Sequence, residues 1–229
     1  MQSAGLMQSI DWFPFWLSLR VACISTLASL IIGLWLAYLL ANRTFRGKEL
    51  VDAAAALPLV LPPTVLGYYL LVAVGRESAF GRLYEWAFGQ PLVFTWQAAV
   101  VASMLHAIPL LVKSARAAFE SVDRTFEMAA RNLGASEWRV FWRITLPLAR
   151  RSVFAAGVLA FARSLGDFGA TIMIAGNIPG RTQTVAVAIY DAVESGNGSL
   201  ARSLVLAISA LSIAILYLAN RIERRKQAA

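Results

Sequence analysis

The 229-residue chain has few of the residue types on which metal sites and nucleophilic catalysis usually depend. It contains one cysteine, Cys23, and one histidine, His106, so an intrachain disulfide and a cysteine-based metal site are both excluded. It also lacks the phosphate-binding pattern Gly-x4-Gly-Lys-Ser/Thr and the His-Glu-x-x-His and Gly-x-Ser-x-Gly motifs. We therefore expect a chain that is not an enzyme and that binds no metal or other cofactor itself.

Charged residues are also scarce, at 15% of the chain, whereas 59% of the residues are hydrophobic and the mean hydropathy is +0.63. Soluble domains contain roughly 25% charged residues. This composition indicates an all-α polytopic membrane protein that contacts the lipid bilayer. The apolar runs predict five transmembrane helices within a single transmembrane domain (1–229), at about 15–41, 50–75, 92–112, 152–176 and 200–220. The opening residues lack a basic segment and an evident cleavage site, so we expect no removable signal peptide.

The net charge of +8 follows the expected membrane topology and does not indicate a nucleic-acid partner. Loop 42–49, loop 113–151 and the tail from residue 221 hold three, eight and four of the 21 Lys and Arg residues, whereas the loops and terminus on the other side hold three. Basic residues concentrate on the cytoplasmic side of membrane proteins. We therefore expect the N-terminus outside, and loop 113–151 and the C-terminus in the cytoplasm.

The most charged long segment, residues 126–147, lies in this cytoplasmic loop. Asp123 is a candidate N-cap for a short helix, and Gly134 fits the position just after its end. Ser136 can cap a second short helix through Arg143. An amphipathic helix pair that lies on the lipid surface would share this pattern.

The same segment carries the spaced pattern Glu-x-Ala-Ala-x3-Gly-x9-Ile-x-Leu-Pro. It resembles the "EAA" loop of ABC importer permeases, through which the membrane subunit holds its ATPase, and the resemblance implies the type I ABC importer permease fold. The two alanines allow close approach by a partner, and aromatic residues at helical spacing form an apolar ridge. By this resemblance the ATPase-coupling residues are Glu127, Ala129, Ala130, Arg131, Gly134, Trp138, Arg139, Phe141, Ile144, Leu146 and Pro147.

Two predicted spans contain residues that interrupt an apolar helix. The second holds Pro58, Pro62 and Pro63, which free backbone carbonyls and bend a helix. In lipid such carbonyls need protein or water partners, so this face is expected to point inward. A kink needed only for packing is equally compatible with the sequence.

The fourth span holds Arg163 and Asp167, which share one face if the helix is continuous. Each charge costs at least about 2.5 kcal/mol in the bilayer. The two residues are either a mutually neutralising structural pair or part of a polar pathway, where Arg163 would add positive potential to an anion route. His106 is expected to be a packed or interface residue. The candidate pathway residues are Arg163, Ser164, Gly166, Asp167, Pro62 and Pro63.

Residues 57–71, 159–171 and 176–182 extend the resemblance to most of the chain, from about 15 to 220. Together they resemble the permease subunit of molybdate ABC importers, although Asp167 stands where members of that family often have Glu. Sulfate/thiosulfate and tungstate permeases are the alternatives with the same mechanism. An ATP-independent secondary transporter is a remote alternative that would need no ATPase-coupling loop.

The resemblance to molybdate importers also implies partners and a location. The chain is expected in the bacterial inner membrane as a homodimer with a second copy of itself. Two ABC ATPase subunits, which hold ATP and Mg, and a periplasmic molybdate-binding protein complete the expected transporter. ATP binding would draw the two coupling loops together and open the pore outward.

Overall fold

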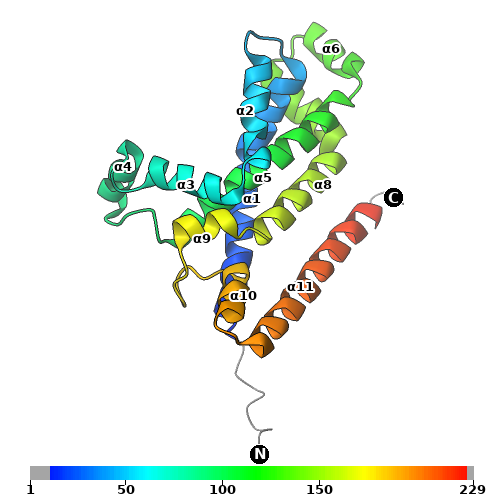
Figure 1. Cartoon of the computed structure of the whole chain (residues 1–229). Helices are drawn as coiled ribbons and strands as arrows, with labels where there is room; N and C mark the ends of the chain where they lie inside the picture. Colours follow the sequence, from blue (N-terminus) through cyan, green and yellow to red (C-terminus); the bar gives the residue numbers. More distant parts are fainter. Residues whose placement is uncertain (1–10, 226–229) are drawn as a thin grey trace, which may run out of the picture.

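The computed structural model describes residues 11–225, except for the side chains of residues 220 and 222–225, and this part of the chain is helical without strands (Figure 1). The N-terminus predicted to be outside (residues 1–10) and Lys226 of the basic tail lie outside the described residues. The elements are α1 (Phe13–Asn42), α2 (Lys48–Val60), α3 (Pro63–Val74), α4 (Ala79–Phe88), α5 (Trp96–Glu120), α6 (Arg124–Asn132), α7 (Glu137–Val140), the π-helical turn η1 (Phe141–Thr145), α8 (Leu146–Leu165), α9 (Gly169–Ala175), α10 (Val185–Glu194) and α11 (Gly198–Arg225).

Four helices in the described part of the chain are long and apolar enough to cross a membrane. They are α1, α5, α11 and one continuous helix from Glu137 to Leu165 that includes α7, η1 and α8. Each exceeds the roughly 20 residues that a bilayer core requires. The first, third and fifth predicted spans are therefore confirmed as single helices.

Helices α1 and α5 run parallel and pack against each other along most of their length, with α8 beside both (Figure 1). Leu17 and Ala98 share one buried cluster near the beginnings of the two helices. Leu40 and Phe119 share a second cluster near their ends. Small buried residues line much of this contact, as is usual where membrane helices approach closely.

The helix of the third predicted span extends beyond its predicted end at residue 112, because its buried face continues past Val112. Ala115 and Phe119 pack against α1, and the helix ends only at Glu120. The first part of loop 113–151 is therefore a continuation of α5.

The second predicted span, 50–75, is bent as its prolines indicated, and the bend divides it into two helices. Helices α2 and α3 are bent by 115° at Leu61 and Pro62. Leu61 has φ −75° and ψ 142°, and Pro62 has φ −55° and ψ 138°. Both residues precede a proline, which disfavours the helical region for the residue before it. Two successive extended residues end α2, and Pro63 begins α3 without needing an N–H partner.

The fourth predicted span, 152–176, is also interrupted: α8 ends at Leu165, and α9 begins at Gly169. Helix α9 packs against α3 at two glycines. A methyl group on Gly169 would lie 2.7 Å from Cβ of Pro63, and one on Gly67 would lie 2.6 Å from Cβ of Met173. The two interrupted spans therefore pack on each other through positions that admit no side chain.

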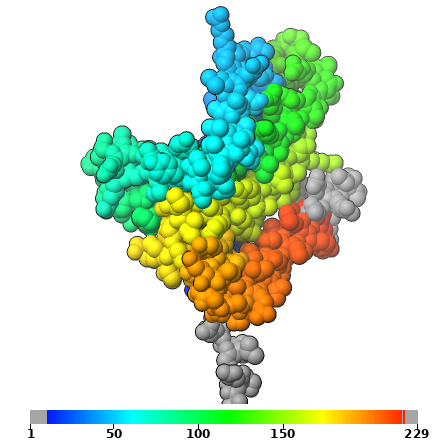
Figure 2. Space-filling view, in the orientation of Figure 1, coloured from blue at the N-terminus to red at the C-terminus, as the bar shows by residue number. Residues whose placement is uncertain are grey.

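The remaining helices extend from this centre. The α3–α4 arm projects to one side of the molecule (Figure 2). Helix α11 packs mainly on α10 and touches α8 more weakly. Many of its large apolar side chains, Ile213 and Leu216 among them, stay exposed.

We expect Gly67→Ala to lower the thermal stability of the protein, because its Cβ would overlap Met173 across the α3–α9 contact. Overpacking of this kind costs about 1–3 kcal/mol. Gly157→Ala in α8 is the matched control, because its Cβ would meet Leu30 at an ordinary 3.7 Å. It should leave stability unchanged or raise it by up to about 1 kcal/mol through helix propensity. Melting temperatures of the two variants in the same detergent test this, and equal values would contradict the close α3–α9 packing.

Candidate functional site

The first helix of the predicted coupling segment forms as expected. The side chain of Asp123 accepts a hydrogen bond from the N–H of Thr125 at 2.8 Å, which holds the pKa of this carboxyl below its usual range. Helix α6 ends at Asn132, and Gly134, two residues later, has a φ of +82°. The N–H groups of Gly134 and Ala135 bond the carbonyls of Arg131 and Ala130. These two bonds form a Schellman motif, which favours glycine at the left-handed position.

The second predicted helix differs from its prediction. Ser136 precedes it with extended backbone, but its side chain makes no capping hydrogen bond. The helix does not end at Arg143; it continues through the π-helical turn η1 into α8. The N–H of Leu146 bonds the carbonyl of Phe141 across this wider turn, directly before Pro147, which has no N–H to donate. The coupling segment is thus joined rigidly to the fourth span.

Glu127 is buried inside its own chain and not displayed to a partner. One carboxylate oxygen accepts a hydrogen bond from the hydroxyl of Thr145 at 2.5 Å, and the other lies 3.2 Å from the guanidinium of Arg131. Arg131 also bonds Glu137 at 2.9 Å, and this bond raises the pKa of the guanidinium further. Glu127 therefore ties α6 to the start of the fourth span.

Glu137 extends this network to α1. The hydroxyl of Tyr38 donates to its carboxylate at 3.2 Å, and Arg43 lies 3.7 Å away. The ring centroid of Tyr38 is 4.8 Å from that of Phe141, which is itself buried. Contacts with α1 and with α6 therefore fix the orientation of the segment that begins at Glu137.

The sequence-predicted coupling residues divide into buried, half-buried and exposed groups. Glu127 and Phe141 are buried and support the segment from inside, with Thr145 as a buried partner that sequence reasoning missed. The side chains that the segment exposes include two apolar residues that were also missed, Phe126 at 56% and Leu133 at 90%. Their spacing of seven residues places them on one helix face, and this was the available signal. The predicted residues that are exposed are Ala129, Gly134, Trp138, Arg139 and Pro147, whereas Ala130, Arg131, Ile144 and Leu146 are half-buried.

A second polar cluster lies at the break between α8 and α9. Asp167 is buried there, and Oδ2 accepts a hydrogen bond from the hydroxyl of Thr171 at 2.6 Å. Its Oδ1 lies 3.4 Å from the guanidinium of Arg163 and 3.1 Å from Nδ1 of His106. The predicted Arg163–Asp167 pair is confirmed, although α8 ends between the two residues. His106 is packed as predicted, but its contact with Asp167 was missed.

Arg163 and Asp167 carry opposite charges, so they partly neutralise each other. The cluster connects three helices, because His106 belongs to α5, Arg163 to α8 and Thr171 to α9. It therefore holds the break at a fixed place.

The remaining candidate pathway residues lie around this break. Pro63 contacts Gly169, two residues after Asp167, so the two interrupted spans meet there. Ser164 is buried, whereas Gly166 lines a cavity of about 170 Å³ between α8 and α11. The side chain of Arg163 is 31% exposed, whereas that of Asp167 is 1% exposed. Of the two predicted pathway charges, Arg163 alone reaches the surface of the single chain.

We expect His106→Phe to destabilise the protein by about 1–3 kcal/mol, because it keeps a ring but removes the contact with a buried carboxylate. His106→Asn is the matched control, since its amide nitrogen occupies the δ position and can still donate to Asp167. Melting temperatures should fall clearly for the first variant and less for the second. Equal losses in both would mean that ring packing, and not the polar contact, is what matters.

Comparison with known proteins gives one family match. Residues 29–227 match the family described as "Binding-protein-dependent transport system inner membrane component".

Among curated relatives, the "Molybdenum transport system permease protein ModB" of Escherichia coli (strain K12) is 46% identical over 209 residues, covering 90% of this chain and 91% of that protein. The protein of the same name from Haemophilus influenzae is 46% identical over 92% of this chain and 93% of its own length. The "Probable sulfate transport system permease protein cysT" of Chlorokybus atmophyticus is 31% identical over 92% of this chain and 73% of its own length.

Solved structures share the fold at low sequence identity. The MetNI methionine ABC transporter in an inward-facing conformation matches with a TM-score of 0.75 and 18% identity, over 97% of this chain and 99% of that chain. A bacterial ABC transporter that imports the acidic polysaccharide alginate matches with a TM-score of 0.75 and 15% identity, over 95% of this chain and 80% of that chain.

Proposed function

Because the chain belongs to the family of inner membrane components of binding-protein-dependent transport systems, we propose that it is the permease subunit of an ATP-driven importer that carries molybdate across the bacterial inner membrane. The observation that carries the choice of molybdate is the 46% identity to molybdenum permeases over nine-tenths of the chain. A sulfate permease is less similar, at 31%. Tungstate remains an alternative cargo, since it is also a tetrahedral dianion.

The chain is a multi-pass protein of the inner membrane. We further propose that its N-terminus is outside and that loop 113–151 is cytoplasmic. The excess of basic residues in loop 42–49, loop 113–151 and the tail supports this orientation.

The chain forms the pore, and the proposed source of energy is a separate ATPase, since the sequence has no phosphate-binding loop. The exposed apolar face of α6, which includes Phe126 and Leu133, is the proposed ATPase contact. A partner that covers these side chains would remove apolar surface from water. The buried bonds of Glu127 would hold this face in position and transmit its movement to the fourth span.

We expect Glu127→Lys to detach or uncouple the ATPase, because it places a cation beside Arg131 in a buried position. Gly134→Asp should have a similar effect for another reason. Gly134 is open to solvent, so the change adds a negative charge to the docking surface. Glu85→Lys in α4 makes the same charge change as Glu127→Lys, but on the proposed external side of the membrane. It should not affect binding of the ATPase. Copurification of the ATPase with each membrane-inserted variant tests this. Normal retention and normal transport in both loop variants would contradict the proposed contact.

We propose a homodimer because a predicted pathway charge and much apolar surface are exposed on the described part of the single chain. Arg163 lies partly exposed at the surface of the single chain, and α11 leaves much of its apolar surface uncovered. A second copy would enclose Arg163 between two subunits, where its charge would attract an anion. Asp167 and His106 would position Arg163, and a periplasmic binding protein would select the cargo.

Uptake of radiolabelled molybdate in cells that lack this gene tests the function and its cargo. Restoring the chain should restore uptake, and excess sulfate should not abolish it. Arg163→Gln should reduce uptake while the ATPase remains bound. Uptake that modest sulfate abolishes would favour a sulfate permease. Transport without any copurified ATPase would favour a secondary transporter and overturn the proposal.

A further inference from the structure

A groove of about 500 Å³ lies beside the coupling segment, between the second half of α1 and the start of the continuous 137–165 helix. This volume is within the range of roughly 300–1,000 Å³ that is typical of ligand sites. We call it the α1–α7 groove. Its apolar walls include Leu30, Leu34, Trp35, Trp138, Phe141 and Trp142.

The walls of the α1–α7 groove suit a hydrocarbon chain better than a polar ligand. The one ionisable carboxylate on the wall, Glu137, is already bonded by Arg131 and Tyr38. The indoles of Trp35, Trp138 and Trp142 are half to two-thirds exposed. Tryptophan is enriched where membrane proteins cross the lipid–water interface. Both helices that form the groove are also candidate membrane spans, and Trp138 and Trp142 belong to loop 113–151. With the proposed orientation, which makes this loop cytoplasmic, the groove lies at the cytoplasmic edge of the bilayer.

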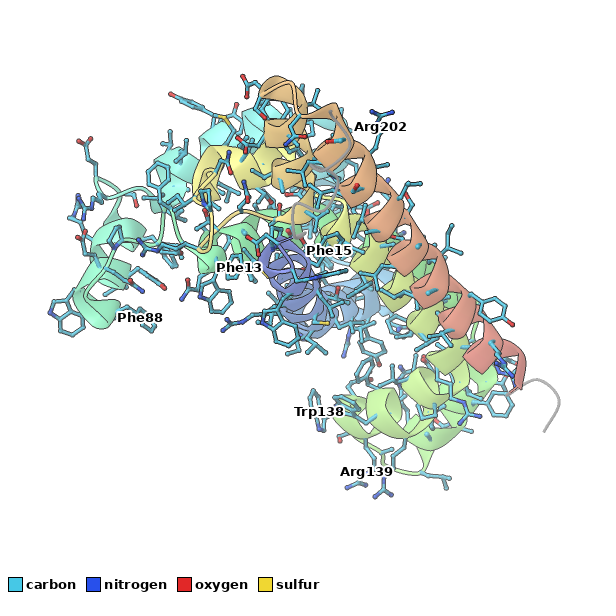
Figure 3. All side chains as sticks on the ribbon, turned by 90° about the horizontal axis from the view of Figure 1, so that it is seen from below. Phe13, Phe15, Phe88, Trp138, Arg139 and Arg202 are labelled. Carbon is cyan, nitrogen blue, oxygen red and sulfur yellow. The ribbon has the colours of Figure 1, made fainter. Side chains whose placement is uncertain are left out.

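The segments next to the α1–α7 groove carry exposed arginines. Arg43 directly follows α1, and its side chain is 55% exposed although it lies 3.7 Å from Glu137. Arg46, in the same loop, and Arg139, beside Trp138, are also exposed. Trp138 and Arg139 leave the helix in different directions (Figure 3), so one turn presents both an apolar wall and a cation. Arginines at this depth complement the anionic headgroups of the cytoplasmic leaflet.

We propose that the α1–α7 groove binds one acyl chain of an anionic phospholipid from the cytoplasmic leaflet, with the lipid phosphate near Arg43 and Arg139. The site lies next to the proposed ATPase contact on α6 and shares Trp138, Arg139 and Phe141 with the coupling residues predicted from the sequence. The bound lipid touches Trp138 and Trp142 of the continuous 137–165 helix on one side and α1 on the other. The composition of the leaflet therefore acts on the position of the coupling segment.

Brominated lipids, which quench tryptophan fluorescence on contact, provide the test. The permease with its ATPase is reconstituted in nanodiscs that contain increasing fractions of brominated phosphatidylglycerol or brominated phosphatidylcholine. The difference between the native protein and Trp138→Phe isolates the signal of Trp138. The fluorescence of Trp138 should be half-quenched at a fraction of brominated phosphatidylglycerol several-fold lower than the fraction of brominated phosphatidylcholine that has the same effect. The difference for Trp86→Phe, on the distant α4, is the control and should show no preference.

The arginines are tested separately in the same assay. Arg43→Gln or Arg139→Gln should each reduce the preference of the Trp138 signal for the anionic lipid by about fivefold, because a basic residue near an anionic surface contributes about 1 kcal/mol. A monodisperse size-exclusion profile shows that each variant is folded. Equal quenching by both lipids would overturn the proposal in favour of unselective lipid contact. Absence of quenching by either lipid would also overturn it, because a segment of the ATPase or of a second copy would then cover the groove.

Discussion

A carboxylate within an apolar span must find compensating partners in the protein, since lipid offers none. Asp167 finds them on three helices: His106 of α5, Arg163 of α8 and Thr171 of α9. These contacts fix the place where the fourth span breaks. The break in turn directs α9 onto α3, where glycines leave no room for a different packing. Much of the arrangement around the proposed pathway therefore depends on one buried charge.

A second ionic network lies at the other end of the same long helix. Glu127 bonds Thr145 in η1, whereas Arg163 lies near the end of α8. At about 1.5 Å per residue, roughly 27 Å of helix separates the two sites. The π-helical turn keeps this helix continuous past Pro147, so a movement of the segment that holds Glu127 would be passed on as a movement of the whole helix. This is the mechanical requirement for coupling an ATPase to a gate.

Local signals were predictable from the sequence. Asp123 caps α6 and Gly134 ends it, because both effects depend on neighbours within one helical turn. The prolines at 62 and 63 correctly indicated an interruption, but the sequence did not give its angle of 115°. Pro147 shows the reverse case, since it lies in the predicted loop 113–151, yet a wider turn absorbs it within one continuous helix. The direction of the chain after a helix breaker depends on what the next helix packs against.

The sequence by itself determined that the chain spans a membrane, where its apolar runs lie and which family it resembles, because hydropathy and spaced motifs are properties of consecutive residues. Only the tertiary structure decided that Glu127 is buried, that His106 contacts Asp167 and that α1 and the coupling helix enclose a groove. Each of these joins residues from different helices. Side chains distant in the chain meet only after the helices have packed. An uncompensated charge is costly in the bilayer, so the favoured packing is one that brings each buried charge to a compensating partner.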